Sequence, residues 1–317
     1  MKDVIVGIDI GGTNSPFGFV DREGNILANG SIKTNAFEKF EDYLDALIAE
    51  INNVNNDNSG LNIIGYGIGA PNGNYYKGTV ENAPNLKWKG TIEFAKMVKS
   101  KTGLNAFLTN DANAAAIGEK IFGNAKDMND FIIITLGTGL GSGIFCGGNL
   151  LYGFTGFAGE LGHTIVIDNG RPCGCSRKGC LETYASATGI VKTVLEKLQT
   201  SSQESVLRNF KPDEITSKLI YEAALQNDKL AIDSFEFTGE ILGKALANAA
   251  AFSSPEAIFL FGGLANSGKF IFEPTIRHME LNMLNNFKGT VKVLPSGLSE
   301  NKAAVLGAAA LCWNELK

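Results

Sequence analysis

Two glycine-rich stretches carry the strongest indication of the fold: VGIDIGGTNSPFGFVDREGNIL at residues 6–27 and IITLGTGLGSGIFCGGNLL at residues 133–151. Each has the pattern of an apolar strand, a Gly-Thr turn, a second strand, and glycine and asparagine before an apolar pair. A shift of 125 residues brings Thr13 onto Thr138 (138 − 13 = 125) and aligns the neighbouring glycines. Two glycine-rich hairpins can resemble each other by chance. Because one copy stands near the start of each half, we predict two related half-molecules facing a ligand cleft.

The order of the predicted elements indicates an α/β fold. Apolar, β-branched runs that end in glycine predict strands, and their near-continuous hydrophobicity indicates burial on both faces. Apolar residues at helical spacing predict helices at 37–51, 229–252 and 300–316, and the asparagine-rich segment 52–60 is interpreted as a loop. Strands alternating with helices are typical of an α/β architecture. The predicted strands are Val4–Ile10, Ile63–Ile68, Ala106–Thr109, Phe131–Leu136, Ala257–Phe261 and Val291–Leu294.

The length and composition favour two globular domains. The chain has 317 residues, of which 44% are hydrophobic and 19% charged, as in ordinary globular proteins. We predict a small N-terminal lobe of residues 1–118, completed by a C-terminal helix at about 300–317. Residues 119–299 would form a larger lobe that carries the cysteine-rich loop.

Several classes of partner are disfavoured by charge and hydropathy. The net charge of −5 gives no electrostatic reason to expect nucleic acid or an anionic membrane surface as partner. No apolar run approaches the roughly 20 residues of a membrane span. The N-terminal MKDVIVGIDIGG contains Asp3 and Asp9 and leads straight into glycines, so it reads as a strand and not as a signal peptide. We therefore predict a cytoplasmic protein, in which disulfides are rare.

The Gly-Thr turns are candidate phosphate sites. Glycines let a backbone turn tightly and direct N–H groups toward an anion, and a threonine hydroxyl adds a donor. Asp9, at the end of the first strand, could hold a Mg²⁺-bound water near those phosphates. Most single Gly-Thr hairpins bind nothing, so the signal is the presence of two copies. A late Gly-Gly turn could lie against a nucleobase or ribose. The candidate nucleotide residues are Asp9, Gly11, Gly12, Thr13, Asn14, Thr138, Gly139, Gly262 and Gly263.

Asp111 is the candidate catalytic base. It follows the predicted strand 106–109 and opens a helix-forming run of alanines. One interpretation is a carboxylate that stabilises the helix N-terminus. The other is a base at the carboxyl end of an interior strand, which phosphoryl transfer to an alcohol requires. Asn110 beside it could hold a neighbouring hydroxyl.

The segment HTIVIDNGRPCGCSRKGCLE at residues 163–182 has the residue types of a metal site. Cys173, Cys175, Cys180 and His163 make up the four ligands of a closed Cys₃His zinc site. A disulfide is disfavoured by compartment and by a count of three, and redox activity usually requires C-x-x-C. His163 could bind the metal through one ring nitrogen and present the other to a substrate hydroxyl. Glu160 and Glu182 flank the segment and are either surface carboxylates or substrate ligands.

Together these motifs resemble the ROK family (repressor, open reading frame, kinase), whose kinases are sugar kinases of the actin/hexokinase superfamily. The resemblance rests on the first turn, G-x-P after a strand, N-D-A-N-x-x-A, the second turn, G-E-x-G-H, C-x-C-x4-C-x-E and the late Gly-Gly, in order from about residue 4 to residue 312. It implies two ribonuclease-H-like lobes that close over ATP·Mg²⁺ and a sugar. It also suggests dimers or tetramers.

The resemblance assigns roles to residues. Asp111 is implied as the base for the sugar hydroxyl, and the Cys₃His set as zinc ligands. The phosphates are implied to face both Gly-Thr turns, and the adenosine the late Gly-Gly. Three departures from the family pattern stand out: Ser176 in place of a usual glycine, Asn14 where many members have lysine, and Pro16, expected to break the second strand. The implied sugar-binding residues are Asn85, Asn110, Asp111, Glu160, His163 and Glu182.

The predicted function is ATP-dependent phosphorylation of a hexose at its 6-hydroxyl, with glucose as the preferred substrate. The same hydroxyl-binding residues would serve fructose, mannose, N-acetylglucosamine or N-acetylmannosamine. A sugar-responsive repressor needs a helix-turn-helix before the first turn, which begins at Gly11 and leaves no room for it. An actin-like assembly protein would leave the cysteine cluster unexplained.

Overall fold

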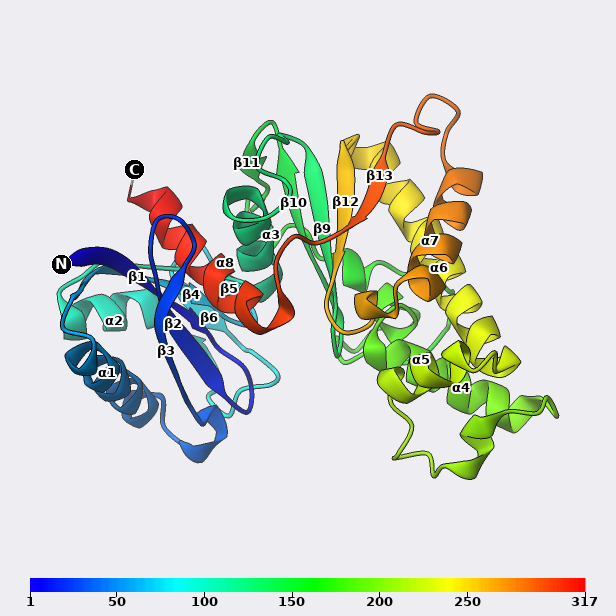
Figure 1. Ribbon diagram of the computed structural model, residues 1–317, viewed down its shortest axis with the longest axis horizontal. Helices are drawn as coiled ribbons and strands as arrows, with labels where there is room; N and C mark the ends of the chain where they lie inside the picture. The colour runs from blue at the N-terminus through cyan, green and yellow to red at the C-terminus, as the bar shows by residue number, and fades with distance from the viewer. Residues whose placement is uncertain (317) are drawn as a thin grey trace. The chain divides into compact units, whose positions relative to one another are not determined.

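Two five-stranded sheets with the same strand order organise the chain (Figure 1). The first has the order β3-β2-β1-β4-β8 and the second β11-β10-β9-β12-β13. In both, the three strands at one side are successive in the chain, and the remaining pairs are parallel. The repeat of the sequence pattern at residues 6–27 and 133–151 is therefore a repeat of topology, and the α/β prediction is confirmed.

The computed structural model describes residues 1–316, which form two compact units. The first unit comprises residues 1–128, 150–158 and 297–316, and the second residues 129–149 and 159–296. No helix within the described residues has the length and apolar character that a membrane span needs.

The first unit contains the first sheet, a small sheet β5-β6-β7 and four α-helices. Aromatic and aliphatic side chains of α1 and α2 pack on one face of the first sheet and form the core. Its elements are β1 Lys2–Asp9, β2 Ser15–Val20, β3 Ile26–Ile32, η1 Thr34–Ala36, α1 Phe40–Asp57, β4 Leu61–Gly69, β5 Gly73–Asn74, β6 Thr79–Glu81, β7 Thr91–Ile92, α2 Phe94–Thr102, β8 Ala106–Thr109, α3 Asp111–Ile121 and α8 Glu300–Glu315.

The second unit packs its helices on the second sheet. Its core combines fully buried side chains of β9 and β12 with the apolar faces of α4, α5, α6 and α7. Its elements are β9 Phe131–Leu136, β10 Leu140–Cys146, β11 Asn149–Leu150, η2 Leu161–His163, η3 Leu181–Thr183, α4 Ala187–Thr200, η4 Val206–Asn209, α5 Ser217–Leu225, α6 Lys229–Ser253, β12 Ala257–Phe261, η5 Ala265–Ser267, α7 Lys269–Asn282 and β13 Lys292–Pro295.

Helix α8 lies beside the first sheet (Figure 1) and contacts it at glycines. A Cβ on Gly67 of β4 would lie 1.8 Å from the carbonyl oxygen of Ala308, and one on Gly7 of β1 would lie 2.2 Å from the backbone of α8. On another side of the helix, a Cβ on Gly307 would lie 2.3 Å from the carbonyl oxygen of Ala114 in α3. Glycine at these positions lets α8 approach both the sheet and α3 with its backbone.

The prediction of a loop at residues 52–60 was wrong over most of its length, because α1 continues to Asp57. Asparagine forms helices poorly, but packing overrides this weak preference. Ile51 is fully buried, and Val54 packs against the same core. These contacts continue the apolar face of α1 into the asparagine-rich segment.

Pro16 does not break the second strand, contrary to the expectation. It lies in β2 opposite Ser31 of β3, while the pairing of β2 with β1 reaches only Phe17. A proline near the start of a strand, beyond the ladder on one side, needs no N–H there.

The first unit extends past the predicted lobe limit at residue 118. Residues 122–128 remain with α3, because the N–H of Asn124 donates to the Glu119 carboxylate at 2.7 Å. The same carboxylate accepts from the N–H of Gly297 at 2.9 Å, where the chain re-enters the unit.

Residues 150–158 also belong to the first unit, so the division between the units falls within β11. The Asn74 amide donates to the carbonyl oxygen of Thr155 at 3.0 Å. The rings of Tyr75 and Tyr152 stack with centroids 4.0 Å apart. Because these contacts come from residues distant in sequence, no local sequence pattern indicates that the segment belongs to the first unit.

We expect Gly67→Ala to lower the free energy of unfolding by about 3 kcal/mol, because its methyl group would overlap the backbone of α8. Gly60→Ala is the matched control, since a Cβ at Gly60 meets nothing within 4 Å. Urea unfolding of both variants measures the difference. Equal stability of the two would contradict the glycine-mediated packing of α8.

Candidate active site

Parallel pairing places Asp9 and Asp111 at the carboxyl ends of parallel strands in the first sheet; this end of the sheet is called its carboxyl edge below. Asp9 is the last residue of β1, and Asp111 is the first residue of α3, shortly after the end of β8. In register, Asp9 aligns with Gly69 of β4, and Gly69 aligns with Thr109 of β8. Gly69 has no side chain to separate the two carboxylates.

The two carboxyl groups interact electrostatically. Desolvation, together with the charge of Asp111, raises the pKa of Asp9 to about 6. Desolvation also raises the pKa of Asp111, against the opposing hydrogen bond from the N–H of Ala112 at 2.8 Å. Asp111 is nevertheless exposed to solvent. A like-charged carboxylate pair is typical of a site that receives a cation, so both residues suit a nucleotide-bound Mg²⁺ nearby.

The helix cap is provided by Asn110 and not by Asp111. The Asn110 Oδ1 accepts a hydrogen bond from the N–H of Asn113 at 2.7 Å, which is the N-cap contact of α3. Capping therefore uses only the carbonyl end of the Asn110 side chain. A role of Asp111 as the helix cap is not needed to explain its position.

The first Gly-Thr turn is held from two sides. The N–H of Gly11 donates to the carbonyl oxygen of Asn14 at 3.1 Å and closes the turn. A Cβ on Gly12 would lie 2.7 Å from the carbonyl oxygen of Asn85, so the loop that carries Asn85 contacts the turn. Thr13 and Asn14 are exposed, as a phosphate site requires.

A buried chain of hydroxyl groups supports this turn and was missed by the sequence analysis. The Tyr43 hydroxyl donates to Ser15 Oγ at 2.8 Å, and Ser15 Oγ lies 2.7 Å from Thr34 Oγ1. Ser15 directly follows the turn, and both Ser15 and Tyr43 are fully buried. Three hydroxyl groups at positions 15, 34 and 43 form no recognisable sequence motif.

In the second unit, the Gly-Gly turn and the second Gly-Thr turn share an edge of the sheet. Gly262 has φ +101°, and a Cβ there would lie 2.9 Å from the carbonyl oxygen of Leu136, the residue before Gly137. Gly263, next in the chain, is exposed. The exposed Thr138 accepts a hydrogen bond from Thr188 Oγ1 at its carbonyl oxygen, at 2.7 Å.

Glu182 lies between the second Gly-Thr turn and the cysteine cluster. Its Oε2 would be 2.6 Å from a Cβ on Gly139, so a side chain there would displace the carboxylate. Its Oε1 accepts a hydrogen bond from Cys173 Sγ at 2.9 Å and lies 3.6 Å from His163 Nδ1. The other nitrogen of His163, Nε2, lies 3.9 Å from Glu160 Oε2.

The four proposed metal ligands converge. One ligand atom from each of His163, Cys173, Cys175 and Cys180 lies within 4.8 Å of every other. His163 Nδ1 is 3.6 Å from Cys173 Sγ, and the Sγ atoms of Cys175 and Cys180 are also 3.6 Å apart. A tetrahedral zinc ion with ordinary bond lengths separates its ligand atoms by about 3.5–3.8 Å. The cluster therefore fits zinc, with Nδ1 toward the ion and Nε2 toward Glu160.

The thiols of this cluster differ in acidity. Desolvation raises the pKa of Cys173 and Cys180. At Cys175, hydrogen bonds from Arg177 outweigh desolvation and lower the pKa to about 6. A bound dication would stabilise the thiolate form of the other two. Every cysteine of the chain is a free thiol, which disfavours the disulfide alternative.

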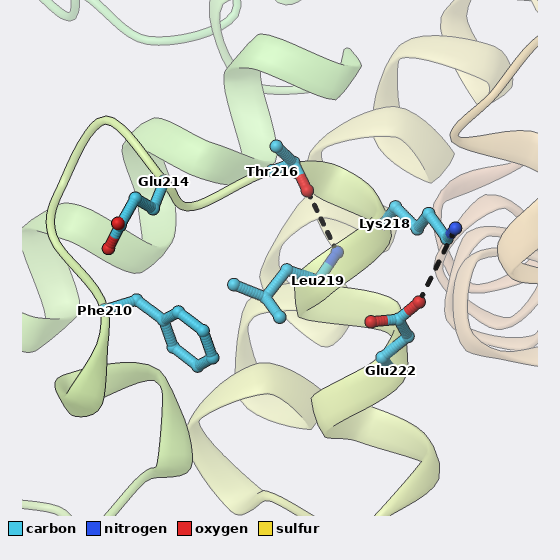
Figure 2. Close-up of a pocket in the computed structure, with 6 residues that line it drawn as sticks. All are labelled: Phe210, Glu214, Thr216, Lys218, Leu219 and Glu222. Carbon is cyan, nitrogen blue, oxygen red and sulfur yellow. Dashed lines mark hydrogen bonds and ion pairs between the residues drawn. The ribbon is translucent and has the colours of Figure 1, made fainter.

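Each unit thus gathers its own share of the predicted residues. The first unit holds Asp9, the 11–14 turn, Asn85, Asn110 and Asp111, and the second holds the remainder. A hollow of about 360 Å³ in the second unit lies elsewhere and is lined by none of them. Figure 2 shows its lining, with the Lys218–Glu222 ion pair and the Thr216–Leu219 hydrogen bond.

Comparison with known proteins agrees with the motifs. The sequence profile of the ROK family matches residues 5–315. A glucokinase from Streptomyces coelicolor is 35% identical over 312 residues, which cover 96% of each chain. The structure of a ROK family glucokinase from Streptomyces griseus in complex with glucose and AMPPNP has a TM-score of 0.81 and 35% identity, covering 97% of this chain and 98% of that one. A xylose repressor from Caldicellulosiruptor bescii is 32% identical over 258 residues, covering 80% of this chain and 63% of the repressor.

We expect Cys175→Ser to abolish metal binding, with bound zinc falling from about one ion per chain to near none. Serine keeps the shape but lacks the thiolate that zinc prefers. Cys146→Ser is the control, because Cys146 is an exposed free thiol outside the cluster. Elemental analysis of both purified variants decides, and full metal content in Cys175→Ser would contradict the assignment.

We expect Asp9→Asn to be more stable than the wild type at pH 8, but not at pH 4. Between its ordinary pKa near 3.8 and its folded pKa of about 6, Asp9 binds more protons in the folded state. The free energy of unfolding therefore falls as pH rises through this window, and asparagine removes that loss. Thermal unfolding at a series of pH values measures it.

Asp21→Asn provides a control of opposite sign. Hydrogen bonds from Lys2 and Asn25 outweigh desolvation and lower the pKa of Asp21 to about 2. Its stabilisation is present above pH 4 and lost as pH falls toward 2, so Asp21→Asn should be less stable than the wild type at pH 8. If Asp9→Asn is instead less stable than the wild type at pH 8, the ionised Asp9 carboxylate does not lower the free energy of unfolding, and the prediction is wrong.

Proposed function

Because the chain belongs to the ROK family, we propose that it is an ATP-dependent hexose kinase that phosphorylates glucose at its 6-hydroxyl. The observation that carries the proposal is the Asn110–Asp111 pair at the carboxyl edge of the first sheet, beside the first Gly-Thr turn. There a carboxylate with a raised pKa lies at the same edge as a turn suited to phosphates. The match to glucokinases along nearly the whole chain supports it.

Asp111 would orient the 6-hydroxyl and accept its proton during transfer. A pKa above the ordinary value makes the carboxylate a better proton acceptor, provided that it remains ionised at the working pH. The N–H of Ala112 holds one oxygen of Asp111 at 2.8 Å and fixes the direction of the carboxylate. Asn110, locked in place by its cap contact, would hold a neighbouring hydroxyl through its NH₂ group.

Backbone donors and Mg²⁺ would stabilise the phosphates of ATP. The exposed Thr13 and Asn14 of the first turn would face the phosphates, as would Thr138 and Gly139 of the second. Bound with the nucleotide, Mg²⁺ would neutralise charge on the phosphoryl oxygens, and Asp9 is the residue suited to face it. The positive φ of Gly262 leaves its turn open to a close approach by adenosine.

The second unit would supply the remaining sugar contacts. Glu160, His163 Nε2 and Glu182 would bind the other hydroxyls, with Asn85 from the first unit. The zinc clip would act structurally, because all four ligand positions are filled by the protein.

The family also contains regulators, so a sugar-responsive regulator is the second candidate. It is favoured by the similarity to a xylose repressor, of which the matched region covers 63%. The kinase is preferred because the match to the Streptomyces coelicolor glucokinase covers 96% of both chains. ADP release with ATP, Mg²⁺ and each of glucose, fructose, mannose, N-acetylglucosamine and N-acetylmannosamine tests the proposal. The proposal is supported if kcat/KM is highest with glucose. It is overturned if none of the sugars causes release of ADP.

We expect Asp111→Asn to bind glucose with nearly unchanged affinity but to lose about 10²–10⁴ in kcat, because asparagine cannot accept the proton. Calorimetric titration with glucose measures binding, and coupled ADP release measures turnover. Near-normal turnover would remove Asp111 from the catalytic role. Loss of glucose binding together with turnover would instead indicate a damaged site.

A further inference from the structure

Arg171 is a buried arginine in the metal-binding loop, two residues before Cys173, and the sequence analysis gave it no role. It is 9% exposed. A buried guanidinium is retained in proteins where its donors are paired. The identity of its partners therefore indicates what the side chain does.

All five N–H donors of the Arg171 guanidinium are used. Nε and Nη2 bind the two carboxylate oxygens of Glu196 at 2.8 and 2.5 Å. Nη1 donates to the carbonyl oxygens of Thr183 at 2.8 Å and Gly189 at 3.1 Å. Nη2 also donates to Thr193 Oγ1 at 2.9 Å.

The guanidinium plane and the backbone of Arg171 are fixed as well. Its Cζ lies 4.4 Å from the centre of the Tyr184 ring. The N–H of Arg171 donates to the Tyr184 hydroxyl at 2.8 Å, and its carbonyl oxygen accepts from the N–H of Gly179 at 2.8 Å. The residue thus has no freedom to shift along the loop.

These partners connect three parts of the candidate site. Thr183 directly follows Glu182, while Gly189, Thr193 and Glu196 belong to α4. The start of α4 is bonded to the second Gly-Thr turn, since the N–H of Ala187 donates to the carbonyl oxygen of Gly137 at 2.9 Å. Arg171 therefore links the loop of Cys173 to the segment of Glu182, and through α4 to the second turn.

We propose that Arg171 is a positioning residue that fixes Cys173 and Glu182 relative to α4. The Cys₃His cluster would hold the loop through residues 163 and 173–180, and Arg171 holds it between these ligands. The kinetic part of this inference rests on the proposed sugar kinase activity, whereas the part on metal retention does not.

Lysine cannot replace Arg171 in this role. Its ammonium has three donors at a single point and cannot bind Glu196 with two parallel hydrogen bonds while reaching both carbonyl oxygens. Arg171→Lys keeps the charge, so it avoids leaving the Glu196 carboxylate without a cation. Arg208→Lys is the matched control, because Arg208 donates to three carbonyl oxygens of the same unit, of residues 198, 201 and 203, away from the cluster.

The test measures zinc release to a chromophoric chelator from zinc-loaded full-length protein, together with glucose kinetics. We expect Arg171→Lys to release zinc about 10–100-fold faster than the wild type, as for loss of a group that orients metal ligands. We also expect a raised KM for glucose with kcat little changed, because Glu182 would bind a sugar hydroxyl and Asp111 is untouched. Arg208→Lys should match the wild type in both.

Each other outcome is decisive. Wild-type zinc release and KM in Arg171→Lys would overturn the inference, as would a wild type that binds no zinc. If Arg171→Lys fails to fold, Glu196→Gln replaces it, since it removes one charge of the same pair at a more exposed residue; unchanged zinc release there would overturn the inference. A wild type without sugar-dependent ADP release would overturn the proposed function alone, because zinc release still measures the role of Arg171.

Discussion

The parallel pairing of β1, β4 and β8 is the constraint from which the candidate catalytic edge follows. It aligns the ends of three strands, and the middle strand ends in Gly69, which has no side chain. Both carboxyl groups are desolvated there, and the charge of Asp111 raises the pKa of Asp9 further. Such a pair is unfavourable in the apoprotein and becomes favourable once a cation shares the site. The electrostatic cost of charging these two carboxyl groups would therefore be lowered by a cation that binds with a nucleotide.

The second sheet repeats the topology but uses its edge differently. Its Gly-Thr turn is approached by the carboxylate of Glu182, which also contacts the cysteine cluster. The position of this carboxylate depends on its hydrogen bond from Cys173 and on the absence of a side chain at Gly139.

The elements of the fold could be predicted where the spacing of apolar residues along the sequence matches a strand or a helix. The strands at 4–10, 131–136 and 257–261 and the helix at 229–252 were found because apolar residues recur at the spacing of a strand or helix. The error at residues 52–60 came from weighing asparagine propensity above the burial of Ile51. Local composition carries no information about which core a helix end meets.

The candidate site was predictable where a motif brings its residues together in sequence. The cysteine cluster and the Asn110–Asp111 pair are of this kind, and the structure brings the four candidate metal ligands together. The hydroxyl chain through Ser15 and the partners of Arg171 were missed, because they come from segments separated in sequence and meet only through tertiary packing.

The most direct measurement of the central claim is the titration of the aspartate carboxyl carbons by ¹³C NMR, with Asp9 assigned from the spectrum of Asp9→Asn. We expect Asp9 to titrate near pH 6 in the free protein and at markedly lower pH once Mg²⁺ and a nonhydrolysable ATP analogue are bound. An ordinary titration near pH 4 in the free protein, or one that Mg²⁺ and nucleotide leave unchanged, would contradict it.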